Sequence, residues 1–179
     1  YTPFDARYCI KDQADYIRQI NRLKEKYASK IQVYLGVEED AFSPLGRQHF
    51  DYIIGSCHYV YNNGKRMPID SNETCFKQCL ASFNNDPLAL AESYYSYFCH
   101  YIKTRKPDII GHFDLITKFD ELEGHLFLDN SDYHKIAEKY ITQLLNSDCI
   151  FEVNTGAIAR GMRTTAYPYE NLLYILQKN

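Results

Sequence analysis

The sequence predicts an α/β protein in which parallel strands alternate with helices, as an open sheet or as part of a barrel. Short apolar runs of strand type recur along the 179 residues, and segments with helical periodicity separate them. Strands that alternate with helices in this way form parallel sheets with right-handed crossovers. No internal repeat, low-complexity tract or interdomain linker interrupts the order, so we expect a single domain.

The first part of the sequence predicts two strands and two helices. A helix is expected over residues 12–27, because its apolar positions form one stripe: Ala14, Ile17, Ile20 and Leu23. A short strand at 31–35 follows, and it ends in the acidic stretch 38–40. A brief helix at 44–50 leads to a second strand at 52–55.

The middle of the chain is predicted to be irregular at first and helical afterwards. Residues 61–75 are polar and rich in turn-forming residues, which indicates a long loop. A short helix is expected at 73–83. A longer helix then runs to about residue 104, with Asp86 as its cap and Pro87 in its first position.

The last part predicts two more strands and two more helices. Residues 109–110 read as the third strand and residues 149–153 as the fourth. Between them, a helix capped by Ser131 or Asp132 is expected to reach about residue 146. A final helix is expected to start at Pro168 and to run through residue 176.

Composition argues against several classes of partner. The net charge of −3 gives no electrostatic reason to expect nucleic acid or an anionic membrane, and no apolar stretch is long enough to span a bilayer. Because a domain of this size needs no disulfide bonds, we expect reduced thiols and a cytoplasmic protein. The thiols are those of six residues: Cys9, Cys57, Cys75, Cys79, Cys99 and Cys149.

Each predicted strand ends in polar residues of the kind that build sites. These residues are Glu38, Glu39 and Asp40, then His58, then His112 and Asp114, and finally Glu152 and Asn154. The carboxyl ends of adjacent parallel strands lie on one rim, so we expect these side chains to lie together. Imidazoles with carboxylates suit Zn²⁺, Mn²⁺ or Fe²⁺.

The same residues also have simpler interpretations that involve no metal site. A single histidine after a strand is more often a packing or capping residue, and three consecutive acidic residues usually form a solvated turn. Glu152 could point into the site or away from it. The other histidines fall on helices or loops without partners and are expected to be surface or packing residues: His49, His100, His125 and His134.

Two arginines follow the fourth predicted strand. Arg160 lies in a glycine-flanked segment, and a flexible guanidinium on the rim can bind phosphate through two hydrogen bonds. We therefore expect Arg160 to be a phosphate contact. The alternative is a solvated loop charge, and this is the interpretation that we favour for Arg163.

Four motifs, in this order and spacing, carry a resemblance to a known family. They are Gly36-Val37-Glu38, Gly55-Ser56-Cys57-His58, Gly111-His112-Phe113-Asp114 and Glu152-Val153-Asn154-Thr155. The chain resembles the PHP (polymerase and histidinol phosphatase) superfamily from about residue 16 to residue 179. Within it, Asp70, Tyr94-Tyr95 and Arg160 followed by Tyr167-Pro168 resemble the histidinol-phosphatase branch.

The resemblance implies a fold, a metal cluster and a reaction. The fold is part of a distorted (β/α)7 TIM-like barrel, and the cofactors are up to three divalent ions of Zn, Mn or Fe. Glu38 would be the bridging carboxylate, with His58 and His112 as further metal ligands in the catalytic centre. Arg160 would bind the phosphate of the substrate, and Asp70 would face its amine or imidazole.

The implied reaction is that of a metal-dependent phosphomonoesterase. L-histidinol phosphate would be hydrolysed to L-histidinol and phosphate in histidine biosynthesis. Metal ions and an arginine suit this chemistry because they neutralise charge on the phosphoryl oxygens. The implied partner is a small phosphate substrate.

The chain also departs from the family pattern. The histidine pair of the family's first strand has no counterpart here, because His49 is the first histidine, and no Asp-x-His pair like that of the family's last strand follows Arg160. Cys9 is expected to end the segment before the first helix. We therefore expect residues 1–179 to be one incomplete PHP-type domain that is inactive alone. Either the sequence is part of a longer protein that completes the sheet, or the unpaired sheet edges pair with another chain, for example in a homo-oligomer.

Two alternatives to histidinol phosphatase stay open. One is a PHP-type phosphoesterase for another small phosphate, which the ligand near Asp70 and Arg160 would reveal. The other is a degenerate, non-catalytic domain that binds metal, phosphate or a partner. The number of metal ions bound per chain separates the second alternative from an enzyme.

Overall fold

The computed structural model describes residues 10–179, so Cys9 lies outside the described residues. Its main sheet has four strands: β1 (Gly36–Asp40), β2 (Tyr52–Ser56), β5 (Ile109–Ile110) and β6 (Ile150–Phe151). They are hydrogen-bonded in the order β1-β2-β5-β6, and every pair is parallel. The prediction of an α/β protein with parallel strand–helix units is confirmed.

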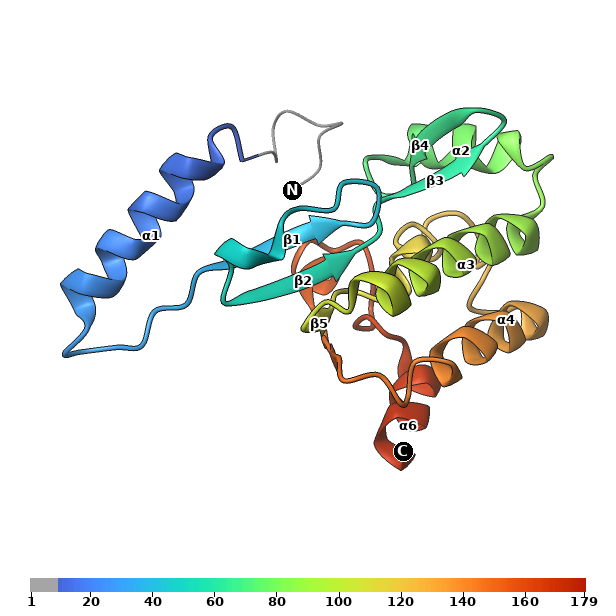
Figure 1. The fold of residues 1–179 in the computed structure, drawn as a ribbon. Helices are drawn as coiled ribbons and strands as arrows, with labels where there is room; N and C mark the ends of the chain where they lie inside the picture. Colours follow the sequence, from blue (N-terminus) through green and yellow to red (C-terminus); the bar gives the residue numbers. More distant parts are fainter. Residues whose placement is uncertain (1–9) are drawn as a thin grey trace.

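Two long helices form the layer beside this sheet. The chain passes from β2 to β5 through α3 (Pro87–Arg105) and from β5 to β6 through α4 (Ser131–Thr142). Since each strand is added on the same side of the previous one, right-handed crossovers place both helices on one face. The two helices lie next to each other (Figure 1), and the rings of Tyr95 and Tyr140 stack between them at 5.9 Å.

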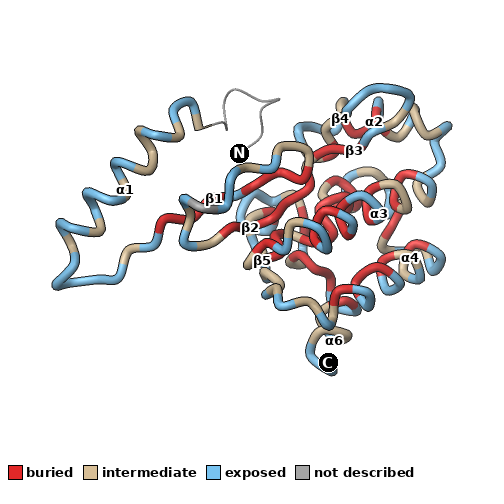
Figure 2. Tube along the Cα trace, in the orientation of Figure 1, coloured by how far each residue is buried: buried red, intermediate tan, exposed pale blue. Residues whose placement is uncertain are grey.

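The core is an aromatic cluster centred on α3. Tyr94, Tyr95 and Phe98 are fully buried, and Phe113 packs against the last two from the segment after β5. Figure 2 shows the buried residues concentrated in the sheet and on α3 and α4. At the start of α3, Asp86 accepts hydrogen bonds from two backbone N–H groups, as predicted for its cap.

The position predicted for the first strand was wrong. Residues 31–35 form no strand, and Ile31 and Tyr34 are exposed. The strand is instead Gly36–Asp40, so the acidic residues 38–40, which were expected just past the end of a strand, belong to the sheet. Glu39 and Asp40 are completely buried, which is possible because each one has charged or polar partners within the fold.

The long loop predicted at residues 61–75 was also wrong, because most of it is a hairpin. It consists of β3 (Tyr59–Asn62) and β4 (Lys65–Pro68), paired antiparallel. Asn63 and Gly64 join them with φ values of 48° and 78°, the left-handed geometry of tight two-residue hairpin turns. The N–H of Ile69 donates to the carbonyl of His58 at 3.0 Å, which fixes the hairpin beside that histidine.

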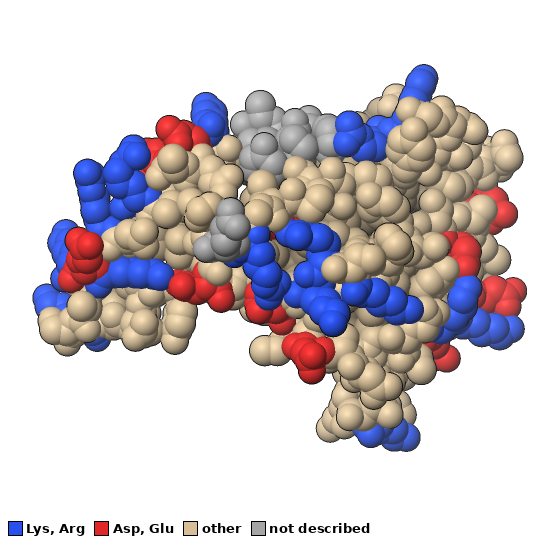
Figure 3. Space-filling model, in the orientation of Figure 1, with Lys and Arg blue, Asp and Glu red and all other residues tan. Residues whose placement is uncertain are grey.

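The first helix, α1 (Gln13–Tyr27), lies where it was predicted, but its apolar stripe is not buried. None of its residues is buried, and it extends away from the sheet (Figures 1 and 2). Lys and Arg side chains gather on its visible face (Figure 3). Tyr16 fastens it to the sheet by donating a hydrogen bond to the carbonyl of Gly36 at 2.6 Å.

The remaining elements are short. They are η1 (Arg47–His49), α2 (Glu73–Ser82), η2 (Leu115–Thr117), α5 (Gly156–Ala159) and α6 (Glu170–Lys178). The last helix begins after Pro168, not at it, because Tyr169 takes the cap position with an extended backbone. The five cysteines among the described residues are free thiols. No helix in residues 10–179 combines the length and apolar character needed to cross a membrane.

Candidate metal centre

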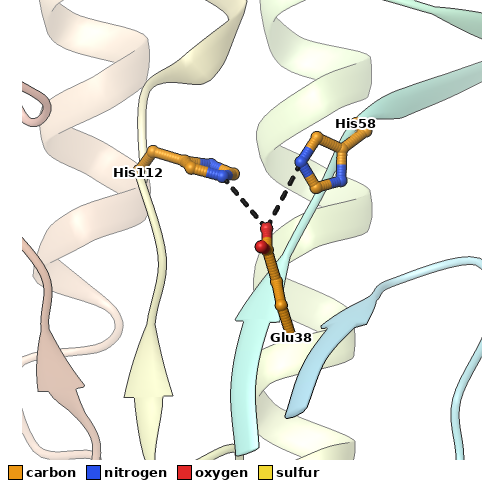
Figure 4. A group of neighbouring side chains, drawn as sticks. All are labelled: Glu38, His58 and His112. Carbon is orange, nitrogen blue, oxygen red and sulfur yellow. Dashed lines mark ion pairs between the residues drawn. The ribbon is translucent and has the colours of Figure 1, made fainter. Parts of the chain in front are cut away.

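Three side chains from three different strands meet at the carboxyl-terminal edge of the sheet. Glu38 lies on β1, His58 follows β2 and His112 follows β5 (Figure 4). The carboxylate oxygen Oε1 of Glu38 is 3.4 Å from Nε2 of His58 and 3.3 Å from Nε2 of His112. Within residues 10–179, this is the one group of three such side chains whose ligand atoms all lie within 4.8 Å of one another.

The strand geometry explains this convergence. Side chains alternate along β1, so Glu38 and Asp40 face one side while Glu39 faces the other. Gly111, just before His112, permits a close approach of neighbouring strand ends: a Cβ atom there would lie 2.7 Å from Oγ of Ser56. The glycine in the motif is therefore needed to bring His112 toward the other two residues.

Each histidine is held by a carboxylate from the strand beside it. Oδ2 of Asp40 accepts from the backbone N–H of His58 at 3.0 Å and lies 3.0 Å from its ring Nδ1. Oε2 of Glu152 accepts from the backbone N–H of His112 at 2.9 Å. The ring of His112 differs from that of His58, because its Nδ1 is buried without a hydrogen-bond partner.

The electrostatics of the group favour positive charge next to Glu38. Burial acts to raise the pKa of Glu38, but the hydrogen bond and charge of His112 and the charge of His58 outweigh it and lower the pKa to about 2. Burial acts to lower the pKa of His58, yet the hydrogen bond to Asp40 and nearby carboxylates raise it. The geometry thus stabilises a cation between a carboxylate and two imidazoles.

The three residues fit a divalent metal ion. Two imidazole nitrogens and one carboxylate oxygen are ligands that Zn²⁺, Mn²⁺ and Fe²⁺ accept. Zinc bonds to such atoms are about 2.0–2.2 Å long, which sets tetrahedral ligands roughly 3.4 Å apart. The separations of 3.3 Å and 3.4 Å match this spacing. Glu38 is about half exposed, so open coordination positions would face solvent or a substrate.

The two predicted substrate contacts lie along the same edge. Asp70 follows Ile69, the residue bonded to the His58 carbonyl, and forms an ion pair with Lys118 at 3.6 Å. Arg160 is exposed at the end of α5, and a Cβ atom on Gly156 would lie 3.1 Å from its guanidinium. Hydrogen bonds link Gly156 through Asn154 to Glu152, and Glu152 holds His112.

The prediction for Arg163 was wrong, since it is not a solvated loop charge. Its side chain is completely buried, and its guanidinium lies 4.2 Å from the ring centre of Tyr167. It donates hydrogen bonds to the hydroxyls of Thr117 and Thr165. Asp114, another predicted strand-end residue, lies 3.9 Å from this guanidinium and accepts from the N–H of Tyr169 at 3.1 Å.

The other histidines lie mostly where expected. His49, His100 and His125 are exposed. His134 is a packing residue but has partners, contrary to expectation. Its Nδ1 pairs with the hydroxyl of Tyr169 and its Nε2 with the carbonyl of Leu128, both at 2.8 Å.

The roles of Asp40 and Glu152 were not recognised in the sequence. The sequence predicts Asp40 only as one of the polar residues at a strand end, and it leaves the direction of Glu152 open. The alternation of a strand was the available signal, because it places Asp40 on the same side as Glu38. That signal required the correct strand position, which the apolar pattern had misplaced by five residues.

Comparisons with known proteins find relatives of one kind. A curated protein of Schizosaccharomyces pombe named "Probable histidinol-phosphatase" is 28% identical over 172 residues, covering 90% of this chain and 55% of the relative. A protein of the same name from Deinococcus radiodurans is 30% identical over 132 residues, covering 67% of this chain and 47% of the relative. The chain therefore spans about half the length of these two curated relatives. No family model matches it.

A solved structure shares the fold. It is the crystal structure of a "putative histidinol phosphatase" from Listeria monocytogenes, with a TM-score of 0.77 and 19% sequence identity. The match covers 95% of this chain and 68% of that one. At this level of identity, the likeness shows the arrangement of the strands and helices alone.

Proposed function

We propose that this chain belongs to a metal-dependent phosphomonoesterase of the histidinol-phosphatase type, within the PHP superfamily. The reaction is the hydrolysis of L-histidinol phosphate to L-histidinol and phosphate. The single observation that carries the proposal is the convergence of Glu38, His58 and His112 on one point. The names of the two curated relatives support the choice of substrate.

We also propose that residues 1–179 form one domain corresponding to part of a (β/α)7 barrel. The strand order is sequential, and α3 and α4 both lie on one face of the sheet. Barrels are wound in this way, whereas a doubly wound sheet reverses direction and places helices on both faces. The shared fold with the Listeria structure agrees with this assignment.

In this proposal, the residues of the chain divide the work of binding and charge neutralisation. Glu38, His58 and His112 hold a divalent ion, which supplies Lewis-acid stabilisation of negative charge on the phosphoryl oxygens. Arg160 binds the phosphate with its guanidinium, since such pairs form two parallel hydrogen bonds. Asp70 accepts a hydrogen bond from the cationic end of the substrate, and Lys118 orients Asp70.

A non-catalytic binding domain is the second candidate. The observation that favours it is that one group of three ligands is found among residues 10–179, whereas the family resemblance implies a larger cluster. In that case, the chain would bind one ion and a phosphate without turnover.

Calorimetry on the zinc-loaded chain tests the substrate. L-histidinol phosphate should bind more tightly than glycerol phosphate. Arg160→Ala should weaken the binding of both esters by roughly tenfold or more, because a hydrogen bond to a charged group contributes about 1.5–3 kcal/mol. Asp70→Asn should reduce the preference for L-histidinol phosphate. Equal binding of the two esters would contradict the assigned substrate.

Metal stoichiometry separates the two candidates. Three ions per chain, held with further ligands from elsewhere, support the enzyme, whereas none or one supports a binding domain. We expect the 179-residue chain alone to be inactive toward L-histidinol phosphate because few of the ligands that the resemblance implies are found among residues 10–179. Hydrolysis by the pure monomer, lost in His58→Ala, would contradict this expectation and establish an enzyme.

A further inference from the structure

The two histidines of the metal centre are held in different ways, although they occupy equivalent places in the fold. Both follow a parallel strand, and each donates its backbone N–H to a carboxylate of the neighbouring strand. Glu38 lies against Nε2 of both rings, but of the two only His58 also has a carboxylate at its Nδ1, that of Asp40 at 3.0 Å. The corresponding Nδ1 of His112 is buried and has no partner.

We infer that Asp40 is a positioning residue that fixes the ring of His58 with its proton on Nδ1 and its Nε2 free to bind the metal ion. The inference deepens the proposed function and rests on it for the identity of the ion. Nδ1 of His112 lacks such a partner, so its ring is held by packing and by the contact of Nε2 with Glu38. His58 is then the preorganised ligand of the centre, and His112 is the adaptable one.

The contacts of Asp40 support this assignment of the proton. Its Oδ1 accepts from the N–H of Phe42 at 2.9 Å, and its Oδ2 accepts from the N–H of His58 at 3.0 Å. A carboxylate that already accepts two backbone donors is an acceptor toward the ring as well, so Nδ1 carries the hydrogen. The neutral ring then has its lone pair on Nε2.

The direction of that lone pair indicates a position for a cation. Nε2 of His58 points at Oε1 of Glu38, 3.4 Å away (Figure 4). Two acceptors that face each other repel unless a cation lies between them. A carboxylate behind a metal-binding histidine makes the imidazole a stronger ligand and fixes its orientation. Asp40 is completely buried, so solvent does not weaken this interaction.

A matched pair of variants tests the inference. Asp40→Asn and Glu152→Gln each remove one negative charge and replace a carboxylate that accepts a ligand histidine's backbone N–H. Only Asp40→Asn also changes the contact with a ring. Zinc affinity, measured by competition with a chelator, should fall about 10–100-fold in Asp40→Asn, the usual effect of losing such a partner, and less than about threefold in Glu152→Gln. An equal loss of zinc affinity in the two variants would overturn the inference.

Nitrogen-15 NMR of the histidine rings provides a readout that does not depend on metal or activity. In the metal-free wild-type chain, neutral His58 should carry its proton on Nδ1, and Asp40→Asn should shift it toward Nε2. A neutral wild-type His58 with its proton on Nε2 would overturn the inference even if Asp40→Asn fails to fold. A wild-type chain with the expected proton but no zinc binding would instead contradict the proposed function alone.

Discussion

Arg105, at the end of α3, donates two separate hydrogen bonds to the carboxylate of Glu39 on β1. Its Nε donates to Oε1 at 3.0 Å and its Nη2 donates to Oε2 at 2.8 Å. The hydroxyl of Tyr101 donates to the same carboxylate at 2.7 Å. Because Glu39 faces the helix and Glu38 faces the opposite side, this ion pair fastens the strand that presents Glu38 to the candidate metal centre.

Removal of the arginine should destabilise the fold strongly. Arg105→Ala leaves the fully buried carboxylate of Glu39 without its charged partner, which typically costs about 3–5 kcal/mol. Lys139→Ala is the control, because Lys139 pairs with Glu92 at an exposed position, where ion pairs contribute little to stability. Urea unfolding measures both. Equal, small losses would show that the buried pair does not anchor β1.

Each member of the metal centre should be necessary for tight metal binding. His58→Ala, His112→Ala and Glu38→Gln remove one ligand each, so zinc affinity should fall by at least tenfold in every variant. His100→Ala provides the control, because His100 is exposed on α3 and outside the group. Calorimetric titration measures affinity and stoichiometry. A variant of the three that binds zinc like the wild type would remove its residue from the centre.

The stability contributed by Asp108 should disappear in acid. Burial acts to raise its pKa, but the N–H of Ile53 and the guanidinium of Arg47 outweigh burial and lower the pKa. A lowered carboxyl pKa gives stability that is present above the unfolded value of about 3.9 and lost as pH falls through the folded value.

Asp108→Asn therefore has a pH-dependent effect. At neutral pH the variant should be less stable by about 1 kcal/mol, the order of one hydrogen-bonded, partly exposed ion pair. Below the folded pKa of Asp108, the wild type and the variant should converge. Urea unfolding over a pH series provides the comparison, and a gap that stays constant into acid would contradict the prediction.

Substitution of Gly55 should overpack the contact between β2 and the end of α3. A Cβ atom at this position would lie 2.7 Å from the ring of Tyr101 and 2.8 Å from the ring of Pro107. Gly55→Ala should therefore cost about 1–3 kcal/mol. The shift of the thermal midpoint reports it, and a midpoint equal to that of the wild type would show that these rings move aside freely.

The sequence could predict the elements that have local signals. Asp86 and Pro87 mark the start of α3, and Ile109–Ile110 is the strand that the apolar run indicated. The rule that sites form at strand ends brought together Glu38, His58 and His112, although they lie far apart along the chain. The turn of the hairpin also had a local signal, Asn63-Gly64, which had been read as part of a loop.

Features that depend on distant partners could not be predicted in this way. Glu39 and Asp40 look like solvated charges until Arg105 and His58 are placed beside them. Arg163 is buried because Tyr167 and Thr117 surround its guanidinium. Burial of a charge depends on tertiary contacts, and a local pattern of apolar residues contains no information about those contacts.

The three candidate ligands come from three separate strands, which has a consequence for folding. They are Glu38, His58 and His112. An ion bound to all three would close two long loops of the chain, as a cross-link does. It would bind the native state and not the disordered one, so each tenfold rise in free ion above its dissociation constant would add about 1.4 kcal/mol to the free energy of unfolding. A chelator would then lower the melting temperature of the chain, and the metal supply would set the free energy of unfolding.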